Sequence, residues 1–249
     1  MTGEGSRVRF RPTFWATVAV IPALILLVIL GVWQVQRMQW KQGLIDDMRS
    51  RMDAPAIELP ADGAELDTLR FRRVELGGEF LHDRAMHRLA RTHEGRRGFD
   101  LITPMRLPDG RTVLIDRGWL PIRLRRDGEM PEALRVDGPV SIEGVIRRGG
   151  WDGAGWLRPA NDPAGNEWLW MDLPRMTQHA ELRDAVTGLY VQSIDPAAAG
   201  RFPIAERPRV NLPQNHLGYA VTWFGLALAL LAIYVIFHLR RETPGGETA

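Results

Sequence analysis

The residues best placed for chemistry lie near the end of the chain, where His216, Tyr219 and Trp223 follow one another at helical spacing. Residues three, four and seven apart share one face of a helix, so the three rings should face the same way. Histidine is the commonest metal ligand in proteins and a known axial ligand of haem iron. His216 is therefore a candidate haem ligand, with Tyr219 and Trp223 packed against the macrocycle. The simpler alternative is a histidine that hydrogen-bonds a neighbouring helix at a membrane edge.

An apolar segment positions this histidine. From Leu217 to Leu239 no side chain is charged, apart from a histidine near the end. At a rise of ~1.5 Å per residue this length crosses a hydrocarbon core of ~30 Å. Asn215 is a suitable N-cap. The sequence predicts a transmembrane helix over residues 215–239, followed by a short tail of residues 240–249.

A second apolar segment lies near the start of the chain and predicts a transmembrane helix over residues 13–36. A cleaved signal peptide is the alternative. The segment is long for a signal peptide, and no small-x-small cleavage motif follows it, which favours an uncleaved anchor. Three arginines lie in the preceding tail, residues 1–12, and two follow the second span. This distribution predicts that both termini are cytoplasmic and that residues 37–214 lie outside the cytoplasm.

Two antiparallel spans place their outer ends at the same depth. Gln34 and Arg37, at the end of the first span, can therefore approach His216 and Tyr219. A guanidinium recognises carboxylates well, so Arg37 could meet a haem propionate.

The central segment has a β-rich pattern. The first helix is expected to continue to about Asp53, before Pro55, and a short helix is expected within residues 173–185. A turn at 108–110 predicts a hairpin, and residues 149–166 read as a loop. The predicted fold is a membrane α+β protein, with two transmembrane helices bracketing an antiparallel sheet or small barrel. Predicted strands are 71–80, 99–107, 111–116, 139–147 and 188–194.

Composition excludes several classes of function. The net charge of +2 and the absence of a recognition motif predict no nucleic-acid binding. Without cysteine there is no disulfide, thiolate metal site or catalytic thiol. No phosphate loop, nucleophile elbow or carboxylate pair suggests an enzyme. His82, Met86, His87 and His93 are close in sequence, but their spacing does not place a metal-ligand set on one face.

One further motif is Arg117-Gly-Trp-Leu-Pro121, which follows a predicted strand. Gly118 permits an unusual backbone angle, and Pro121 can end a strand. Trp119 is best read as a core anchor. The alternative is that Arg117, Gly118, Trp119 and Pro121 form a docking surface for a partner.

Three motifs in order resemble the surfeit locus protein 1 family of cytochrome c oxidase assembly factors. They are Gly31-Val-Trp-Gln-Val-Gln-Arg37, Arg117-Gly-Trp-Leu-Pro121 and Asn215-His-Leu-Gly-Tyr-Ala-Val-Thr-Trp-Phe224. Gly98-Phe-Asp-Leu-Ile-Thr-Pro104 is similar to a strand of the same family. The resemblance runs from about Gly31 to Leu239 and is weak between Pro121 and Leu189.

The resemblance implies a bacterial inner-membrane protein with a periplasmic domain that assists assembly of a haem-copper oxidase. It implies transient binding of haem a, with His216 at the position of the family's suspected ligand, and delivery to oxidase subunit I. Gln34, Arg37, Tyr219 and Trp223 would support the haem. The implied partners are subunit I, haem a synthase and the lipid bilayer. An assembly factor of this kind is not an enzyme.

Two alternatives stay open. The first is a purely structural chaperone that stabilises subunit I by helix packing and binds no haem. The second is a membrane-anchored sensor or enzyme whose β-domain, residues 55–210, binds a small molecule. The lack of a catalytic set and of a cytoplasmic output domain speaks against the second. The sequence leaves open whether the client is a cytochrome c or a quinol oxidase, and whether copper insertion is affected.

Overall fold

The computed structural model describes residues 8–60, 66–125, 132–151, 153–194, 202–205 and 215–241. The chain forms two compact units. One consists of Met1–Asp46 with Asn211–Ala249, and the other of Asp47–Val210. The predicted tails lie largely outside the described residues.

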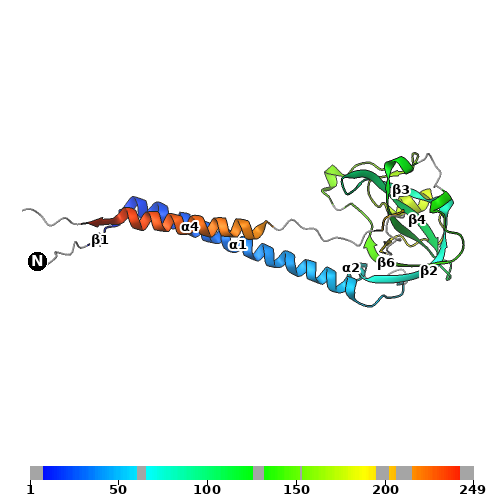
Figure 1. The fold of residues 1–249 in the computed structure, drawn as a ribbon, viewed down its shortest axis with the longest axis horizontal. Helices are drawn as coiled ribbons and strands as arrows, with labels where there is room; N and C mark the ends of the chain where they lie inside the picture. The colour runs from blue at the N-terminus through cyan, green and yellow to red at the C-terminus, as the bar shows by residue number, and fades with distance from the viewer. Residues whose placement is uncertain are drawn as a thin grey trace, which may run out of the picture. The chain divides into compact units, whose positions relative to one another are not determined.

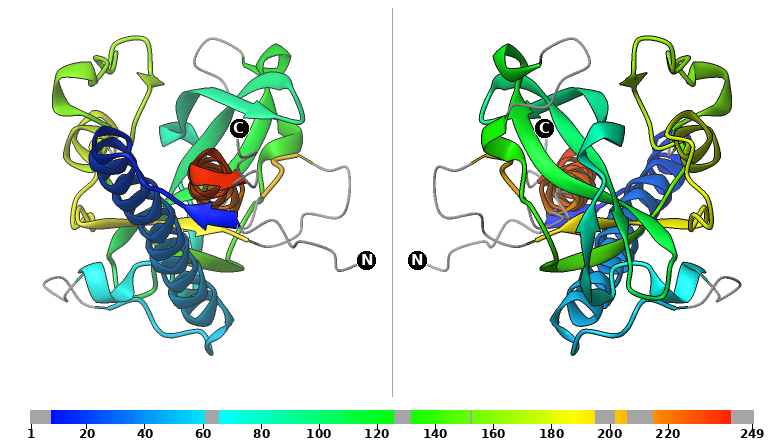
Figure 2. Two further views of the ribbon diagram at one scale, coloured as in Figure 1. Left: turned by 90° about the vertical axis from the view of Figure 1, so that its left-hand side faces the viewer. Right: turned by 90° about the vertical axis from the view of Figure 1, so that its right-hand side faces the viewer.

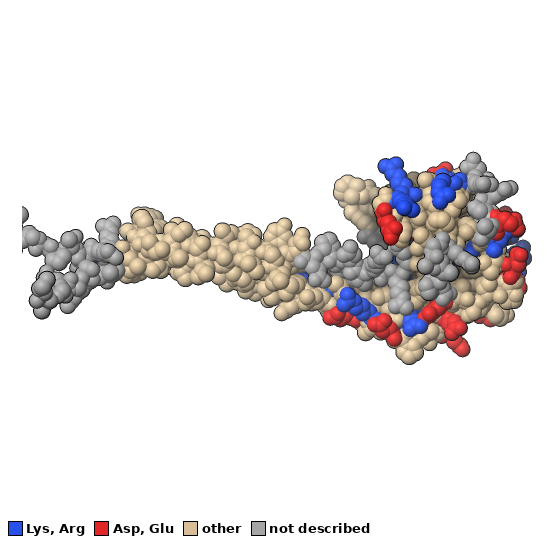
Figure 3. Space-filling model, in the orientation of Figure 1, with Lys and Arg blue, Asp and Glu red and all other residues tan. Residues whose placement is uncertain are grey.

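Two long helices dominate the first unit. Helix α1 spans Phe14–Asp53 and helix α4 spans His216–His238 (Figure 1). Both are long and apolar enough to cross a membrane. Where α4 lies beside α1, the face of the pair in Figure 3 shows no Lys, Arg, Asp or Glu. The prediction that the first helix continues to Asp53 is confirmed. Asn215 occupies the N-cap position of α4, but its side chain makes no capping hydrogen bond.

The two helices are antiparallel and contact each other along their length. The hydroxyls of Thr17 and Tyr234 are 2.5 Å apart, and Thr13 Oγ1 lies 2.9 Å from His238 Nε2. Nearer the other end, a Cβ on Gly31 would come within 2.7 Å of the Phe224 ring, so the glycine permits close approach of the backbones.

A strand pair lies beside one end of the helices. Strand β1, Val8–Phe10, is antiparallel to β9, Leu239–Arg241. The sequence analysis predicted tails at both places and no strand in either. The strands form because α1 and α4 bring the chain ends together, and the exposed backbone groups then pair with each other.

The second unit contains a five-stranded barrel in the order β2-β6-β8-β5-β4, closed by pairing of β4 with β2. Strands β3 and β7 extend the sheet beyond β4 (Figure 2). The strands are β2 (Arg73–Phe80), β3 (Met86–His93), β4 (Arg96–Arg106), β5 (Thr112–Pro121), β6 (Val140–Arg148), β7 (Glu167–Trp168) and β8 (Leu189–Ser193). Short helices are α2 (Leu66–Leu69), α3 (Leu173–His179), η1 (His82–Arg84), η2 (Ile122–Leu124), η3 (Glu132–Leu134) and η4 (Gly155–Leu157).

The predicted strands, the β4–β5 hairpin and the short helix α3 are confirmed. The predicted small barrel is confirmed, but the expectation that its strands are antiparallel is wrong in part, because β5 pairs with β8, and β3 with β7, in parallel. A parallel pair requires a long connection between its strands. The long segment between β5 and β8 is such a connection. The periodicity of the sequence shows where strands lie but not which strands pair. Strand β3 was also missed, and β5 runs on to Pro121.

Alternation along β5 separates two cores. Val113 and Ile115 point into the barrel interior, where they join Ile142, Ile146 and Val191. Leu114 points to the opposite face of the sheet, where Ile102, Tyr190 and Trp168 pack with Met176 of α3. Charged residues on either row of β5 are therefore placed against a core.

Candidate functional site

The candidate ligand His216 lies in the first turn of α4, beside α1. Its Nδ1 is 2.8 Å from Oε1 of Gln34, whose side chain is buried. Because an amide oxygen only accepts, Nδ1–H is the donor, and the proton is held on Nδ1. Nε2 then bears the lone pair that a metal needs. The sequence placed Gln34 and His216 at the same depth in the membrane, and the structure shows that their side chains are in contact.

The Nε2 atom of His216 is enclosed and has no hydrogen-bond partner in the described part of the chain. Buried polar atoms are normally satisfied, so an orphaned nitrogen fits a ligand that the protein takes up. Since the atom is enclosed, a ligand can reach it only when a neighbouring side chain turns away.

The residues expected to support a haem at His216 are largely exposed. Tyr219 is 55% exposed and Trp223 is half-buried, three and seven positions beyond His216 on α4. The exposed Arg37 has its guanidinium carbon 4.1 Å from the centre of the Trp40 ring. These side chains offer an open aromatic surface and a cation near the histidine. One imidazole nitrogen is a donor that would fit haem iron.

A second constellation, in the barrel domain, was missed by sequence reasoning. Arg88 of β3 pairs with Asp100 of β4, and its Nη2 lies 3.0 Å from Asp116 Oδ2 of β5. Arg91 Nε lies 2.8 Å from Asp100. The side chains of Arg88, Asp100 and Asp116 are 12%, 8% and 3% exposed. The signal in the sequence that could have indicated this cluster is the presence of Asp100 and Asp116 within otherwise apolar strands.

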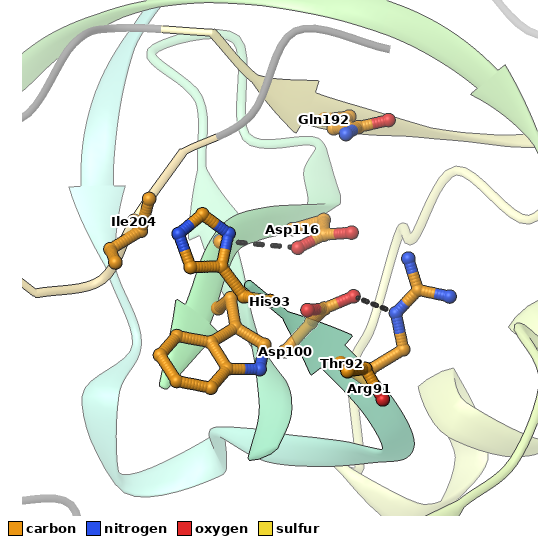
Figure 4. Close-up of a pocket in the computed structure, with 9 residues that line it drawn as sticks. Arg91, Thr92, His93, Asp100, Asp116, Gln192 and Ile204 are labelled. Atoms are coloured by element: carbon orange, nitrogen blue, oxygen red, sulfur yellow. Dashed lines mark hydrogen bonds and ion pairs between the residues drawn. The ribbon is translucent and has the colours of Figure 1, made fainter. Parts of the chain in front are cut away.

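This cluster borders a cavity of about 40 Å³ that Trp119 and His93 also line (Figure 4). Burial raises the pKa of Asp116 to about 6, although Arg88 beside it acts in the opposite direction. Two carboxylates facing two guanidiniums leave little net charge to attract a metal. Among the described residues no group of three or more His, Asp or Glu could hold a metal ion. The cluster is best understood as a device that joins β3, β4 and β5.

The segment Arg117–Pro121 lies mainly inside the domain. Trp119 is 5% exposed, and its backbone exchanges two 2.9 Å hydrogen bonds with Ile204. Gly118 and Pro121 are also buried. The interpretation of Trp119 as a core anchor is confirmed. The docking role of the motif stays a prediction, and Arg117 is its only member that is half-buried rather than buried.

Gly118 should tolerate no side chain. Its φ is +117°, and a Cβ there would overlap the carbonyl oxygen of Ile204. We expect Gly118→Ala to lower the free energy of unfolding by about 2–4 kcal/mol, because backbone strain and a steric overlap add. Gly110 is the matched control, since its φ is +91° with nothing within 4 Å of a Cβ. Gly110→Ala should cost only about 1–2 kcal/mol, as measured by urea unfolding. Equal losses would contradict the steric part of this prediction.

The three histidines that lie close together in the sequence, His82, His87 and His93, have different surroundings in the structure. His82 lies in η1, where Nε2 accepts a hydrogen bond from the Val136 backbone at 3.1 Å. His87 is buried against Phe99, with ring centres 4.9 Å apart. His93 stacks at 5.1 Å on Trp119.

His87 should make the domain sensitive to acid. Burial, aided by Arg125, lowers its pKa from 6.5 to about 4. The unfolded chain therefore binds the proton more readily, so stability is complete above pH 6.5 and falls as pH drops towards 4. We expect a loss of roughly 2–3 kcal/mol over this window.

His87→Gln should remove that loss while leaving the opposite contribution of Asp116 unchanged. The measurement is urea unfolding, followed by tryptophan fluorescence, at both ends of the window. A variant with the same pH dependence as the wild type would show that His87 is not the titrating group.

The SURF1 family model matches residues 21–228, which include both motifs of the helix pair and the whole barrel. The Surfeit locus protein 1 of Homo sapiens is 33% identical over 232 residues, covering 87% of this chain and 75% of the human protein. The chain belongs to the SURF1 family. A SURF1-like protein of Monosiga brevicollis is 31% identical over 229 residues, covering 88% and 84% of the two chains. The Mus musculus protein is 32% identical over 233 residues, covering 86% and 72%.

The resemblance inferred from the three short motifs is therefore confirmed. The matched SURF1 region includes Gln34, Arg37, His216, Tyr219 and Trp223. The candidate site thus lies within the part of the chain that the SURF1 family shares.

Proposed function

We propose that this SURF1-family protein is an assembly factor for a haem-copper terminal oxidase of the cytochrome c oxidase type. It binds haem a transiently and aids delivery of the haem to oxidase subunit I. Haem a synthase is the source from which it receives the haem. The protein lies in the bacterial inner membrane with both termini in the cytoplasm and the barrel domain in the periplasm. It catalyses no reaction.

The observation that supports this proposal is the state of His216. Gln34 fixes the proton on Nδ1, and Nε2 is left without a partner among the described residues. When bound, haem a would supply an iron that can accept the Nε2 lone pair of His216. Tyr219 and Trp223 offer an apolar surface for the ring, and Arg37 offers a charge for a propionate. A single histidine ligand beside exposed aromatic side chains suits temporary holding better than permanent retention.

The test is an absorption spectrum of the protein purified in detergent after co-expression with haem a synthesis. We expect a Soret band and a reduced haem a band in the wild type, and their loss or shift in His216→Ala. His179→Ala is the matched control, because His179 is exposed on α3 in the other unit. Equal spectra in wild type and His216→Ala would exclude His216 as the ligand.

A structural chaperone without haem remains the second candidate. Most apolar side chains of α1 and α4 are not covered by the rest of the protein. In the most apolar stretch of each helix, only 6% (α1) and 11% (α4) of the residues are buried. Such a surface can pack against lipid or against helices of subunit I. Capture of oxidase subunit I by a protein that never shows a haem band would favour this function.

A further inference from the structure

A short turn of the barrel domain presents large apolar side chains to the solvent. The turn is η4, Gly155–Leu157, in the long connection between β6 and β7. Trp156 is 84% exposed, Leu157 is 57% exposed, and Trp151 nearby in the chain is 36% exposed. Among the described residues no other large apolar side chain is as exposed as Trp156, those of α1 and α4 included. Exposed apolar side chains that gather in one place indicate an interaction site.

Hydrogen bonds within this connection hold the turn. The amide of Gly150 donates to the carbonyl of Met171 at 2.8 Å, which closes the base of the connection. The carbonyl of Ala154 accepts from the indole of Trp151 at 3.1 Å and from the amide of Leu157 at 2.9 Å. The exposed side chains of η4 therefore project from a turn with a defined backbone.

The next residue adds a positive charge to the apolar tip. Arg158 is exposed, and its guanidinium carbon lies 5.2 Å from the centre of the Trp170 ring. A tryptophan, a leucine and an arginine in succession suit the interface between a bilayer and water. Tryptophan is enriched at the level of the headgroups, leucine enters the acyl boundary, and arginine is attracted to anionic lipids.

The size of this surface favours lipid over a protein partner. A stable protein–protein interface buries about 800 Å² on each partner, whereas one aromatic side chain buries about 150–250 Å². Trp156 and Leu157 alone offer too little area for such an interface. A bilayer requires no such area, because two helices of the same chain are long and apolar enough to cross it. That connection raises the effective concentration of lipid around the barrel domain.

The connection is also short enough to allow contact. Helix α1 continues beyond Arg37, at the expected end of the first span, to Met48, which packs against Phe71, Val145 and Ile194 of the barrel domain. The rise from Arg37 to Met48 is about 16 Å. A domain of this size is roughly 40 Å across, so its width exceeds the length of the connection.

We infer that the η4 turn binds the surface of the membrane that the protein crosses. Trp156 and Leu157 enter the interfacial layer of the phospholipid, and Arg158 lies near the phosphates of anionic headgroups. The barrel domain thus has a membrane contact of its own, in addition to the two spans. The inference rests on the membrane placement proposed above and is independent of haem binding at His216.

The absence of cysteine allows a fluorescent label at one chosen position of the full-length protein. Ala154→Cys, beside the exposed pair, carries a nitrobenzoxadiazole label, and the protein is reconstituted in vesicles of phosphatidylcholine and phosphatidylglycerol. Part of the phosphatidylcholine bears a nitroxide on its acyl chain, close to the headgroup. We expect this lipid to quench the label. Leu228→Cys, labelled in the same way near the middle of α4, reports whether the spans are inserted.

Further substitutions in the labelled Ala154→Cys protein locate the contact. Trp156→Ser combined with Leu157→Ser should lower the fraction of protein in contact with lipid roughly tenfold or more, because two apolar side chains no longer leave water. Ile122→Ser is the matched control, since it removes an exposed apolar side chain of η2 and should leave the quenching unchanged. Arg158→Gln should weaken the quenching in vesicles that contain phosphatidylglycerol but not in phosphatidylcholine alone.

The two label positions separate this inference from the proposed membrane placement. A quenched label at Leu228→Cys with an unquenched label at Ala154→Cys would overturn the inference and leave the placement intact. No quenching at either position would overturn both. Quenching that persists in the combined Trp156→Ser and Leu157→Ser variant would overturn the inference as well. So would a label that ignores lipid and responds only to added oxidase subunit I, which would identify a protein-binding turn instead.

Discussion

Arg88→Met should lower the free energy of unfolding by about 3–5 kcal/mol at neutral pH. The substitution keeps the volume of the side chain but removes the charge between Asp100 and Asp116, whose side chains are only 8% and 3% exposed. Two carboxylates are then left buried close together, and Arg91 stays as a guanidinium partner of Asp100. Removing one partner of a buried ion pair costs more than the pair contributes, because the remaining charge stays desolvated.

The measurement is urea unfolding of the full-length protein at neutral and acidic pH. Arg73→Met is the matched control, because Arg73 and Glu143 form a similar pair with both side chains 32% exposed. That variant should lose about 1 kcal/mol or less. The deficit of Arg88→Met should shrink as pH falls, since burial raises the pKa of Asp116 and so favours its neutral acid in the folded state. Equal losses in the two variants would show that the Arg88 cluster is effectively solvated.

The second large effect concerns Gln34. Gln34→Leu should weaken haem a binding by roughly 10–100-fold while leaving the helix pair intact. Leucine matches the shape of the glutamine stem but cannot accept the Nδ1–H of His216, which lies 2.8 Å from Oε1 in the wild type. The ring is then free to rotate and to carry its proton on either nitrogen.

The readout is the haem a spectrum of the purified protein at a series of haem concentrations. Gln34→Glu should preserve the band, because a carboxylate accepts the same hydrogen bond. Gln36→Leu, an exposed position on another face of α1, should have no effect. If Gln34→Leu bound haem a as tightly as the wild type, with an unchanged spectrum, Gln34 would have no role in positioning the ligand.

The helix pair shows how far local sequence can lead. Continuous apolar segments bounded by charged tails predicted both spans, and helical spacing put His216, Tyr219 and Trp223 on one face. Because two spans of one chain must be antiparallel, Gln34 and His216 were expected at one depth. The contact between them depends on the close approach at Gly31 and Phe224, and only the folded helix pair shows that distance.

In the barrel domain, the sequence and the tertiary structure determine different features. Alternation and turn residues determined where β2, β4, β5, β6 and β8 lie along the chain, because these signals act within a few residues. Pairing partners depend on contacts between distant segments, so the parallel β5–β8 pair and the closure of β4 on β2 were decided only by the tertiary structure. The pairing of β4 with both β3 and β5 brings Arg88, Asp100 and Asp116 together from three strands. The sequence by itself determined the two long apolar helices, the five strands of the barrel and the family. The tertiary structure decided which charged residues meet, because buried charges find their partners across the sheet rather than along the chain.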